Sequence, residues 1–232
     1  MPVCAVAEAS RSHIKTLCLN ESQDLKIVRV FGTVNDVFTQ LRKVRGGTDS
    51  SPCEFDFDSY SYHYGLFVND QAVGTMTVTR AADGIIDCED LYPGDAIQRY
   101  RQVLASPCKF RINSGMHSTL RTLRLMLREA WRDQLTHGTR VVVINAEKLL
   151  VRFYNRMGFD VIDNSQFVHP LLGTDSICMS MRADPETDNH FADLFATVDT
   201  PIDREHWVDA CKRTSPVECL VSSNSTADLA SF

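Results

Sequence analysis

Three side chains able to carry a proton lie close together in an acidic and aromatic segment, residues 54–64. Asp56 and Asp58 are two positions apart, and His63 follows five positions later. Such groups can take a proton from an ammonium, directly or through a water molecule, and so prepare an amine for nucleophilic attack. The alternative is that the two carboxylates hold a loop together while His63 faces a sheet. The sequence leaves both interpretations open.

Tyr154 is a candidate proton donor. It lies in residues 145–158, where apolar side chains recur at helical spacing. A phenol can donate a proton to a leaving group such as a thiolate. Because position 154 falls on the predicted buried stripe of the helix, the alternative is that the tyrosine only packs.

Four arginines mark one side of a longer predicted helix. They are spaced by three or four residues and therefore share a helix face: Arg121, Arg124, Arg128 and Arg132. In a chain with a net charge of −6, this basic face suits the acidic surface of a partner protein or the phosphates of a ligand. The alternative is a solvated face paired with Glu129 and Asp133.

The eight cysteines include no C-x-x-C pair, so the sequence predicts neither a zinc site nor a fold held by disulfides. We expect reduced thiols and no metal. Cys108 begins the strand ahead of the arginine helix, and its thiol could accept a transferred group. A role as a small buried hydrophobic residue is the alternative.

The strands and helices that must position these residues follow from hydrophobic spacing. Strands are predicted at residues 25–31, 64–68, 72–80, 108–112, 141–144, 160–163 and 176–181. Helices are predicted at residues 34–45, 96–104, 120–137 and 145–157, with weaker patterns at 189–198 and 203–212. The second and third strands flank Asn69 and Asp70 as a β-hairpin. The β-branched run 141–144 predicts an interior strand, after which Asn145 would cap a helix.

Length and composition indicate one globular domain. With 232 residues and 44% hydrophobic content, the chain can bury one large core. We expect an N-terminal extension with little structure at residues 1–24, an α/β domain at 25–182 with a mixed sheet and helices on both faces, and a helical extension with a disordered tail at 183–232. The acidic balance argues against broad nucleic-acid binding. No run approaches the roughly 18 apolar residues of a membrane span, and we expect a cytoplasmic location.

A family resemblance follows from these motifs. The hairpin containing Gly74, the bent strand, the long helix, the buried strand and the helix ending at Met157-Gly158-Phe159 together resemble the GNAT superfamily of N-acyltransferases over residues 25–182. The glycine-rich pyrophosphate loop usual in that superfamily is missing, since residues 111–117 contain one glycine. Residues 56–63 look like the acidic segment of the acyl-homoserine-lactone synthases and the long-chain N-acyl amino acid synthases. The segment 169–173 resembles the second group.

The resemblance implies an enzyme that passes an acyl chain from acyl carrier protein or coenzyme A to the amine of a small molecule such as an amino acid. A backbone N–H at a bulge in residues 109–113 would bind the thioester carbonyl, Tyr154 would protonate the thiolate, and Asp56, Asp58 or His63 would serve as base. The arginine stripe would contact the carrier protein. We expect these residues to bind the donor: Phe110, Arg111, Ile112, Asn113, Ser114, Gly115, His117, Arg121 and Arg124.

Three positions depart from the pattern of the lactone synthases. Ser61 stands in place of an aspartate, Thr77 in place of an arginine and Cys108 in place of a glutamate. The resemblance connects those residues with S-adenosylmethionine, so we do not expect that substrate. We prefer direct attack of the amine to an acyl-enzyme at Cys108. Two alternatives remain: a GNAT enzyme that uses short acyl-coenzyme A on another amine, and a non-catalytic GNAT-like binding module.

Overall fold

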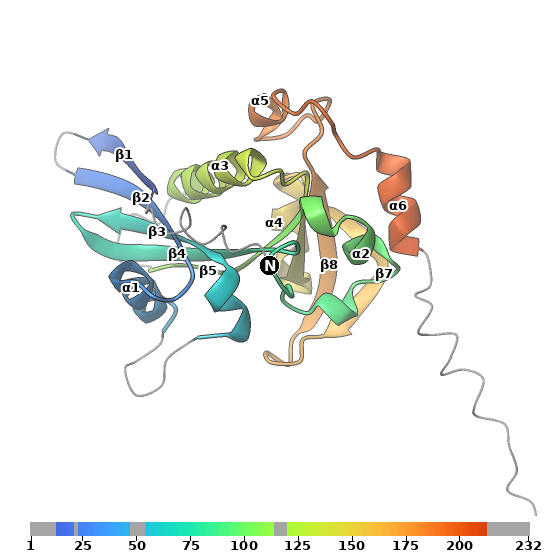
Figure 1. Cartoon of the computed structure of the whole chain (residues 1–232), viewed down its shortest axis with the longest axis horizontal. Coiled ribbons are helices and arrows are strands. Elements are labelled where there is room, and N and C mark those ends of the chain that lie inside the picture. Colours follow the sequence, from blue (N-terminus) through green and yellow to red (C-terminus); the bar gives the residue numbers. More distant parts are fainter. Residues whose placement is uncertain (1–12, 21–22, 47–53, 114–119, 213–232) are drawn as a thin grey trace, which may run out of the picture.

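One eight-stranded sheet forms the centre of the protein (Figure 1). The computed structural model describes residues 13–20, 23–46, 54–113 and 120–212. The strand order is β1-β2-β3-β4-β5-β6-β8-β7. The strands are β1 (His13–Asn20), β2 (Gln23–Phe31), β3 (Tyr62–Val68), β4 (Gln71–Arg80), β5 (Leu104–Ile112), β6 (Val141–Glu147), β7 (Asp160–Val168) and β8 (Asp175–Arg182).

Helices cover both faces of this sheet, as the sequence predicts. The α-helices are α1 (Asp36–Val44), α2 (Ala96–Arg99), α3 (Leu120–Thr136), α4 (Val151–Arg156), α5 (Ala192–Phe195) and α6 (Arg204–Lys212). The short 3₁₀ turns are η1 (Asp56–Tyr60), η2 (Glu89–Leu91), η3 (Arg101–Val103) and η4 (Lys148–Leu150). In the described residues no helix is both long enough and apolar enough to pass through a bilayer.

Strand β6 is the interior strand that its sequence predicts. Val142 and Ile144 belong to the core on the α3 face, which also contains Trp131. Val141 and Val143 belong to the core on the opposite face. Because successive side chains of a strand point to opposite faces, a continuous β-branched run satisfies both cores at once.

Strands β5 and β6 are the only parallel neighbours among the described strands, with α3 as their crossover. They pair only at Leu104 with Val141 and at Ala105 with Val142. Beyond that point the strands separate, next to Pro107, which has no N–H to offer a ladder. The sheet is therefore continuous at one end of this pair and open at the other.

Three predictions about local structure are wrong. Residues 13–20, predicted as part of a little-structured extension, form β1 and pair with β2. Asn145 lies inside β6 and caps no helix, because its amide donates instead to the Asp87 carbonyl at 3.0 Å. The helical segment begins at η4, and Leu149 is 90% exposed although the helical pattern places it on the buried stripe.

The other elements agree with the sequence-based prediction to within a few residues, except that β7 runs five residues further and that the helix predicted at 96–104 divides into α2 and η3. The C-terminal helices α5 and α6 are also confirmed, and they contribute Phe195 and Trp207 to the two cores. The tail predicted to be disordered, residues 222–232, lies outside the described residues.

Candidate active site

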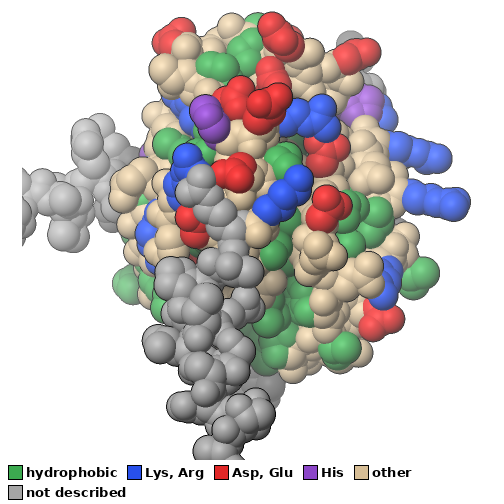
Figure 2. All heavy atoms as spheres, turned by 90° about the vertical axis from the view of Figure 1, so that its right-hand side faces the viewer, with side chains coloured by type: hydrophobic (Ala, Val, Ile, Leu, Met, Phe, Trp, Pro, Cys, Tyr) green, Lys and Arg blue, Asp and Glu red, His purple; other side chains and the backbone are tan. Residues whose placement is uncertain are grey.

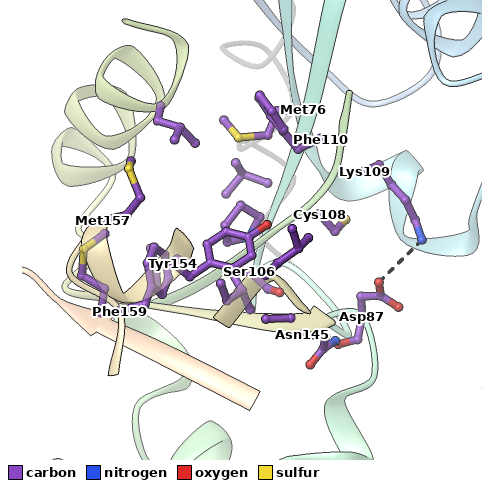
Figure 3. Close-up of a pocket in the computed structure, with 18 of the residues that line it drawn as sticks. Met76, Asp87, Ser106, Cys108, Lys109, Phe110, Asn145, Tyr154, Met157 and Phe159 are labelled. Atoms are coloured by element: carbon purple, nitrogen blue, oxygen red, sulfur yellow. Dashed lines mark hydrogen bonds and ion pairs between the residues drawn. The ribbon is translucent and has the colours of Figure 1, made fainter. Parts of the chain in front are cut away.

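A cavity of about 540 Å³ lies where β5 and β6 separate (Figure 3). Strand β5 contributes residues 106–110 to its wall, and β6 contributes residues 142–147 with one gap at 143. Helices α3 and α4 and the loop at Asp87 complete the lining. Its volume falls in the range of sites that bind small molecules.

The end of the cavity beneath α3 is apolar. It is lined by side chains of the core on that face, among them Met76, Leu127, Trp131, Met157 and Phe191. Trp131 in turn packs edge-on against Phe195, with ring centroids 5.0 Å apart. This end can hold a hydrocarbon chain, since burying apolar surface is favourable by roughly 25 cal/mol per Å².

The opposite end is polar. Asp87, Lys109, Asn145, Glu147 and His169 line it, and Asp87 comes from a loop that packs on the face of the sheet away from α3. The cavity therefore crosses the sheet through the opening between β5 and β6. A molecule with an apolar chain and a polar head can lie across this opening.

A β-bulge shapes the middle of the cavity. Thr75 pairs with Arg111 and Thr77 with Cys108, so Met76 faces two residues of β5, Lys109 and Phe110. Lys109 has a φ of 52°, the left-handed conformation found in one class of bulge. A bulge leaves its extra residue out of the ladder, which is how bulges beside active sites can present backbone groups to a ligand. The sequence-based prediction of a bulge in residues 109–113 is confirmed.

Tyr154 lines the cavity and is half-buried, and its hydroxyl points toward β5 (Figure 3). Burial, together with the charge of Glu147, raises its pKa above the usual value of 10. The phenol therefore stays protonated across the physiological range and can donate a hydrogen bond into the cavity. Its ring also packs edge-on against Phe153 and Phe159, so packing and a chemical role coexist at this position.

Asp58 and His63 lie away from the cavity, and both are completely buried. Both oxygens of Asp58 accept hydrogen bonds from Nη1 of Arg45, at 3.0 and 2.8 Å. The Phe55 N–H also donates to Asp58 Oδ2 at 2.8 Å. These contacts support the structural alternative for Asp58, which ties η1 to the end of α1.

His63 is held by the same network. Its Nε2 lies 2.9 Å from the carbonyl oxygen of Asp58 and therefore carries the ring proton, while Nδ1 faces Nη2 of Arg45 at 3.1 Å. Burial, with a contribution from the Arg45 charge, lowers its pKa to about 4. Thr77, where the resemblance places an arginine, accepts a hydrogen bond from Arg45. The unprotonated ring nitrogen of His63 faces a guanidinium, so this histidine is a poor base for a substrate amine.

The remaining predicted site residues are dispersed. Asp56 is exposed on η1, outside the cavity. Phe110 lines the cavity, whereas Arg111 donates to the Arg45 carbonyl at 3.0 Å. Ile112 pairs with Gly74, and the Asn113 N–H donates to the Val73 carbonyl. Ser114, Gly115, His117 and the side chain of Arg121 lie outside the described residues.

The arginine stripe divides among several partners. Arg124 is exposed. Arg128 pairs with Asp193 of α5, and Arg132 pairs with Glu129. Asp133 pairs instead with Arg29 of β2, at 2.8 Å. The pairing of Arg132 agrees with the solvated alternative.

Asp87, Cys88 and His169 bring three potential metal-ligand atoms within 4.8 Å of one another. The backbone N–H groups of Leu171 and Leu172 donate to Nδ1 of His169, at 3.2 and 3.3 Å. The ring proton is therefore on Nε2, which lies 3.7 Å from Cys88 Sγ. Burial and the Asp87 charge raise the pKa of the Cys88 thiol to about 12. A protonated Nε2 and a neutral thiol suit hydrogen bonding better than metal ligation.

Sequence reasoning missed the side chains of Asp87, Lys109 and Glu147 as part of the cavity wall. Asp87 belongs to an irregular loop with no period that relates it to β5 or β6. Lys109 reads as an ordinary polar position of an alternating strand, and only the bulge changes its direction. For Glu147 the sequence offers one signal, a charged residue at the end of the buried strand β6.

Comparisons with known proteins identify a family and a fold. The family model described as "N-acyl amino acid synthase FeeM" matches residues 43–182, more than half of the chain. No curated protein sequence matches significantly. Among solved structures, the AHL synthase LasI is similar with a TM-score of 0.54 and 16% identity, covering 78% of this chain and 95% of its own.

Two further structures are similar. TofI in an apo form gives a TM-score of 0.55 at 14% identity, covering 69% of this chain and 93% of its own. MesI, a CoA-dependent acyl-homoserine lactone synthase, gives 0.51 at 11% identity, covering 71% and 89%. At these identities the similarity establishes a shared fold.

Proposed function

The chain belongs to the family of N-acyl amino acid synthases, a branch of the GNAT superfamily of N-acyltransferases, and from that premise we propose which molecules it joins. We propose that it forms an amide between a long-chain acyl group, delivered as a thioester, and the amine of a small molecule such as an amino acid. The observation that carries this proposal is the cavity that crosses the sheet between β5 and β6, with an apolar end under α3 and a polar end at Asp87.

The apolar end supports a long acyl chain. Its walls come from α3, α4 and the interior of the sheet, and they include the uncharged side chains of Met76, Leu127, Trp131 and Met157. A short acyl group would leave much of the apolar end under α3 unfilled and would gain little from apolar burial. The alternative of a short acyl-coenzyme A donor is therefore less well supported.

In the proposed reaction the thioester carbonyl lies at the bulge. A backbone N–H of Lys109 or Phe110 would bind the carbonyl oxygen and stabilise the negative charge that develops when the amine attacks. Tyr154 would donate to the sulfur as the C–S bond breaks. The amine would attack the thioester directly, because burial raises the pKa of the Cys108 thiol to about 12 and leaves no thiolate to form an acyl-enzyme.

The donor carrier is acyl carrier protein or coenzyme A. Arg124 gives an exposed positive charge on α3 for either one. MesI, which has a similar fold, is CoA-dependent. We place the reaction in the cytoplasm, where reduced thiols such as Cys88, Cys108, Cys178 and Cys211 are the rule.

Thiol release tests the proposal. Purified protein is mixed with C4 to C16 acyl groups on acyl carrier protein and on coenzyme A, with amino acids as acceptors, and the amide is identified by mass spectrometry. We expect release that depends on the amine and is faster with long chains. Release with short acyl-coenzyme A alone would favour the short-chain alternative. Absence of release with every donor and amine would identify a non-catalytic module.

A further inference from the structure

The polar end of the cavity holds two oppositely charged side chains that face each other, Asp87 and Lys109 (Figure 3). Asp87 Oδ2 lies 3.6 Å from Lys109 Nζ, and the two side chains are 13% and 16% exposed. This distance is longer than a hydrogen bond, so each group attracts the other without using its hydrogen-bonding capacity. Both charges therefore remain able to bind a ligand in the cavity.

Asp87 is held from several sides. Its carbonyl accepts a hydrogen bond from Asn145 Nδ2 at 3.0 Å, which ties the loop to β6. Its Oδ1 accepts a hydrogen bond from Cys88 Sγ at 3.6 Å, and that sulfur lies 3.7 Å from Nε2 of His169. These contacts fix the carboxylate beside the opening in the sheet.

Lys109 is held by the bulge and by two aromatic rings. Its left-handed backbone redirects the side chain at the break in the β4–β5 ladder. The ammonium lies 4.0 Å from the ring centroid of Phe55 and 5.8 Å from that of Phe57, close enough for cation–π attraction. Both rings belong to the acidic and aromatic segment, which thus serves the site through its aromatic residues.

We propose that Asp87 and Lys109 form the subsite that binds both charged groups of the α-amino acid acceptor. Asp87 binds the ammonium and Lys109 binds the carboxylate, through charge-assisted hydrogen bonds. The ammonium and the carboxylate of an α-amino acid are bonded to the same carbon. The two protein groups that bind them must therefore also lie close together, as Asp87 and Lys109 do. The inference rests on the proposed N-acyl transfer and names the residues that select the amine.

The same geometry assigns Asp87 the role of base. As the C–N bond forms and the C–S bond breaks, Asp87 takes a proton from the attacking nitrogen. Overall the ammonium nitrogen loses two protons and the sulfur gains one, so one proton passes to solvent. Glu147, the other carboxylate of the cavity, is less suited because it lies near Tyr154, where its charge acts on the phenol.

Paired acceptors test the subsite. Initial rates and calorimetric binding are measured with phenylalanine against 2-phenylethylamine, and with leucine against 3-methylbutylamine, so that each pair differs by one carboxylate. Lys109→Met should raise KM for the amino acid about 10- to 100-fold more than it raises KM for the plain amine, because one hydrogen bond to a charged group is lost. Lys109→Arg should restore part of the preference.

Asp87→Asn should lower kcat about 100-fold or more with either acceptor, the usual effect of losing a general base, and Asp87→Glu should recover part of it. KM for the acyl donor should not change in any variant. Lys43→Met and Asp90→Asn are the matched controls, since both residues are exposed and lie outside the cavity.

Each outcome decides the inference. A Lys109→Met enzyme that still prefers the carboxylated acceptor, or a loss of activity in Glu147→Gln while Asp87→Asn stays active, overturns it. Wild-type turnover without preference for amino acids overturns the subsite and leaves N-acyl transfer standing. Amino-acid binding that depends on Lys109, with no thiol release from any donor, supports the subsite and contradicts the proposed function.

Discussion

At the scale of single residues, burial decides which ionisable groups can react. Asp58 and His63 form a buried hydrogen-bond network with Arg45, whereas the charged side chains of Asp87 and Lys109 line a cavity. The residue types alone do not distinguish these pairs. What distinguishes them is whether the charged group is enclosed by protein partners or lines a cavity.

Cys108→Ala should keep turnover within a few-fold of the wild type. Desolvation raises the pKa of this half-buried thiol to about 12, so it is neutral at pH 7 to 9 and a poor nucleophile. Steady-state thiol release at saturating donor measures this. Loss of turnover in a variant with an unchanged melting temperature would point to an acyl-enzyme.

Tyr154→Phe should lower kcat about 100-fold, at the lower end for general acid catalysis because a thiolate is a good leaving group. The ring packing against Phe159 is kept, so KM for the donor and the melting temperature should stay the same. Because the pKa of Tyr154 lies above 10, kcat of the wild type should show no loss from this group up to pH 9. Equal kcat values for the two proteins would reduce Tyr154 to a packing residue.

His63 should make stability depend on pH. Its pKa is about 4 in the folded protein against 6.5 for an unperturbed histidine, so the unfolded chain takes up the proton first as the pH falls below 6.5. Between pH 7 and pH 4 the wild type should lose about 3 kcal/mol of unfolding free energy through this group. Urea unfolding at both pH values measures the loss, which His63→Gln should remove and the exposed-site control His206→Gln should keep.

At the scale of elements, the separation of β5 from β6 creates the site. Two paired positions hold the strands together at one end, and the bulge at Lys109 with Pro107 beside it turns β5 away at the other. A fully paired sheet would fill this space with ladder hydrogen bonds. Helix α3 then provides the wall on which an acyl chain can lie.

Ala130→Leu should shorten the acyl chain that the enzyme prefers. Ala130 is buried on α3 and lines the apolar end, so extra methyl groups there occupy space that the chain would use. The rate with a C4 donor serves as the internal control and should stay near that of the wild type. An unchanged chain-length profile from C4 to C16 would place the acyl chain elsewhere.

At the scale of the whole molecule, the C-terminal region completes the domain. Residues 191–198 cover Trp131 on the α3 face, and α6 packs Trp207 against β8, with its indole N–H donating to Ser180 at 3.0 Å. Figure 2 shows the side of the molecule that lies at the right of Figure 1, where Lys and Arg side chains alternate with Asp and Glu. This described face carries no single-sign patch of the kind that phosphate backbones bind.

Trp207→Ala should lower the free energy of unfolding by about 3–5 kcal/mol, because a large side chain that is only 4% exposed leaves a cavity behind. Val208→Ala, its neighbour on α6 and 38% exposed, is the matched control and should change stability by less than about 0.5 kcal/mol. Chemical unfolding measures both. Equal effects would mean that α6 is not part of the folding unit.

The sequence by itself determined the order of most strands and helices, the interior strand β6, the hairpin, and the family to which residues 43–182 belong. These follow from local spacing of apolar residues and from motifs a few residues long. Tertiary structure decided which charged residues meet. Asp87 and Lys109 lie 22 positions apart, and Arg45 reaches Asp58 and His63 from the end of α1. No local period encodes such contacts, because they depend on how strands pair and where a ladder opens.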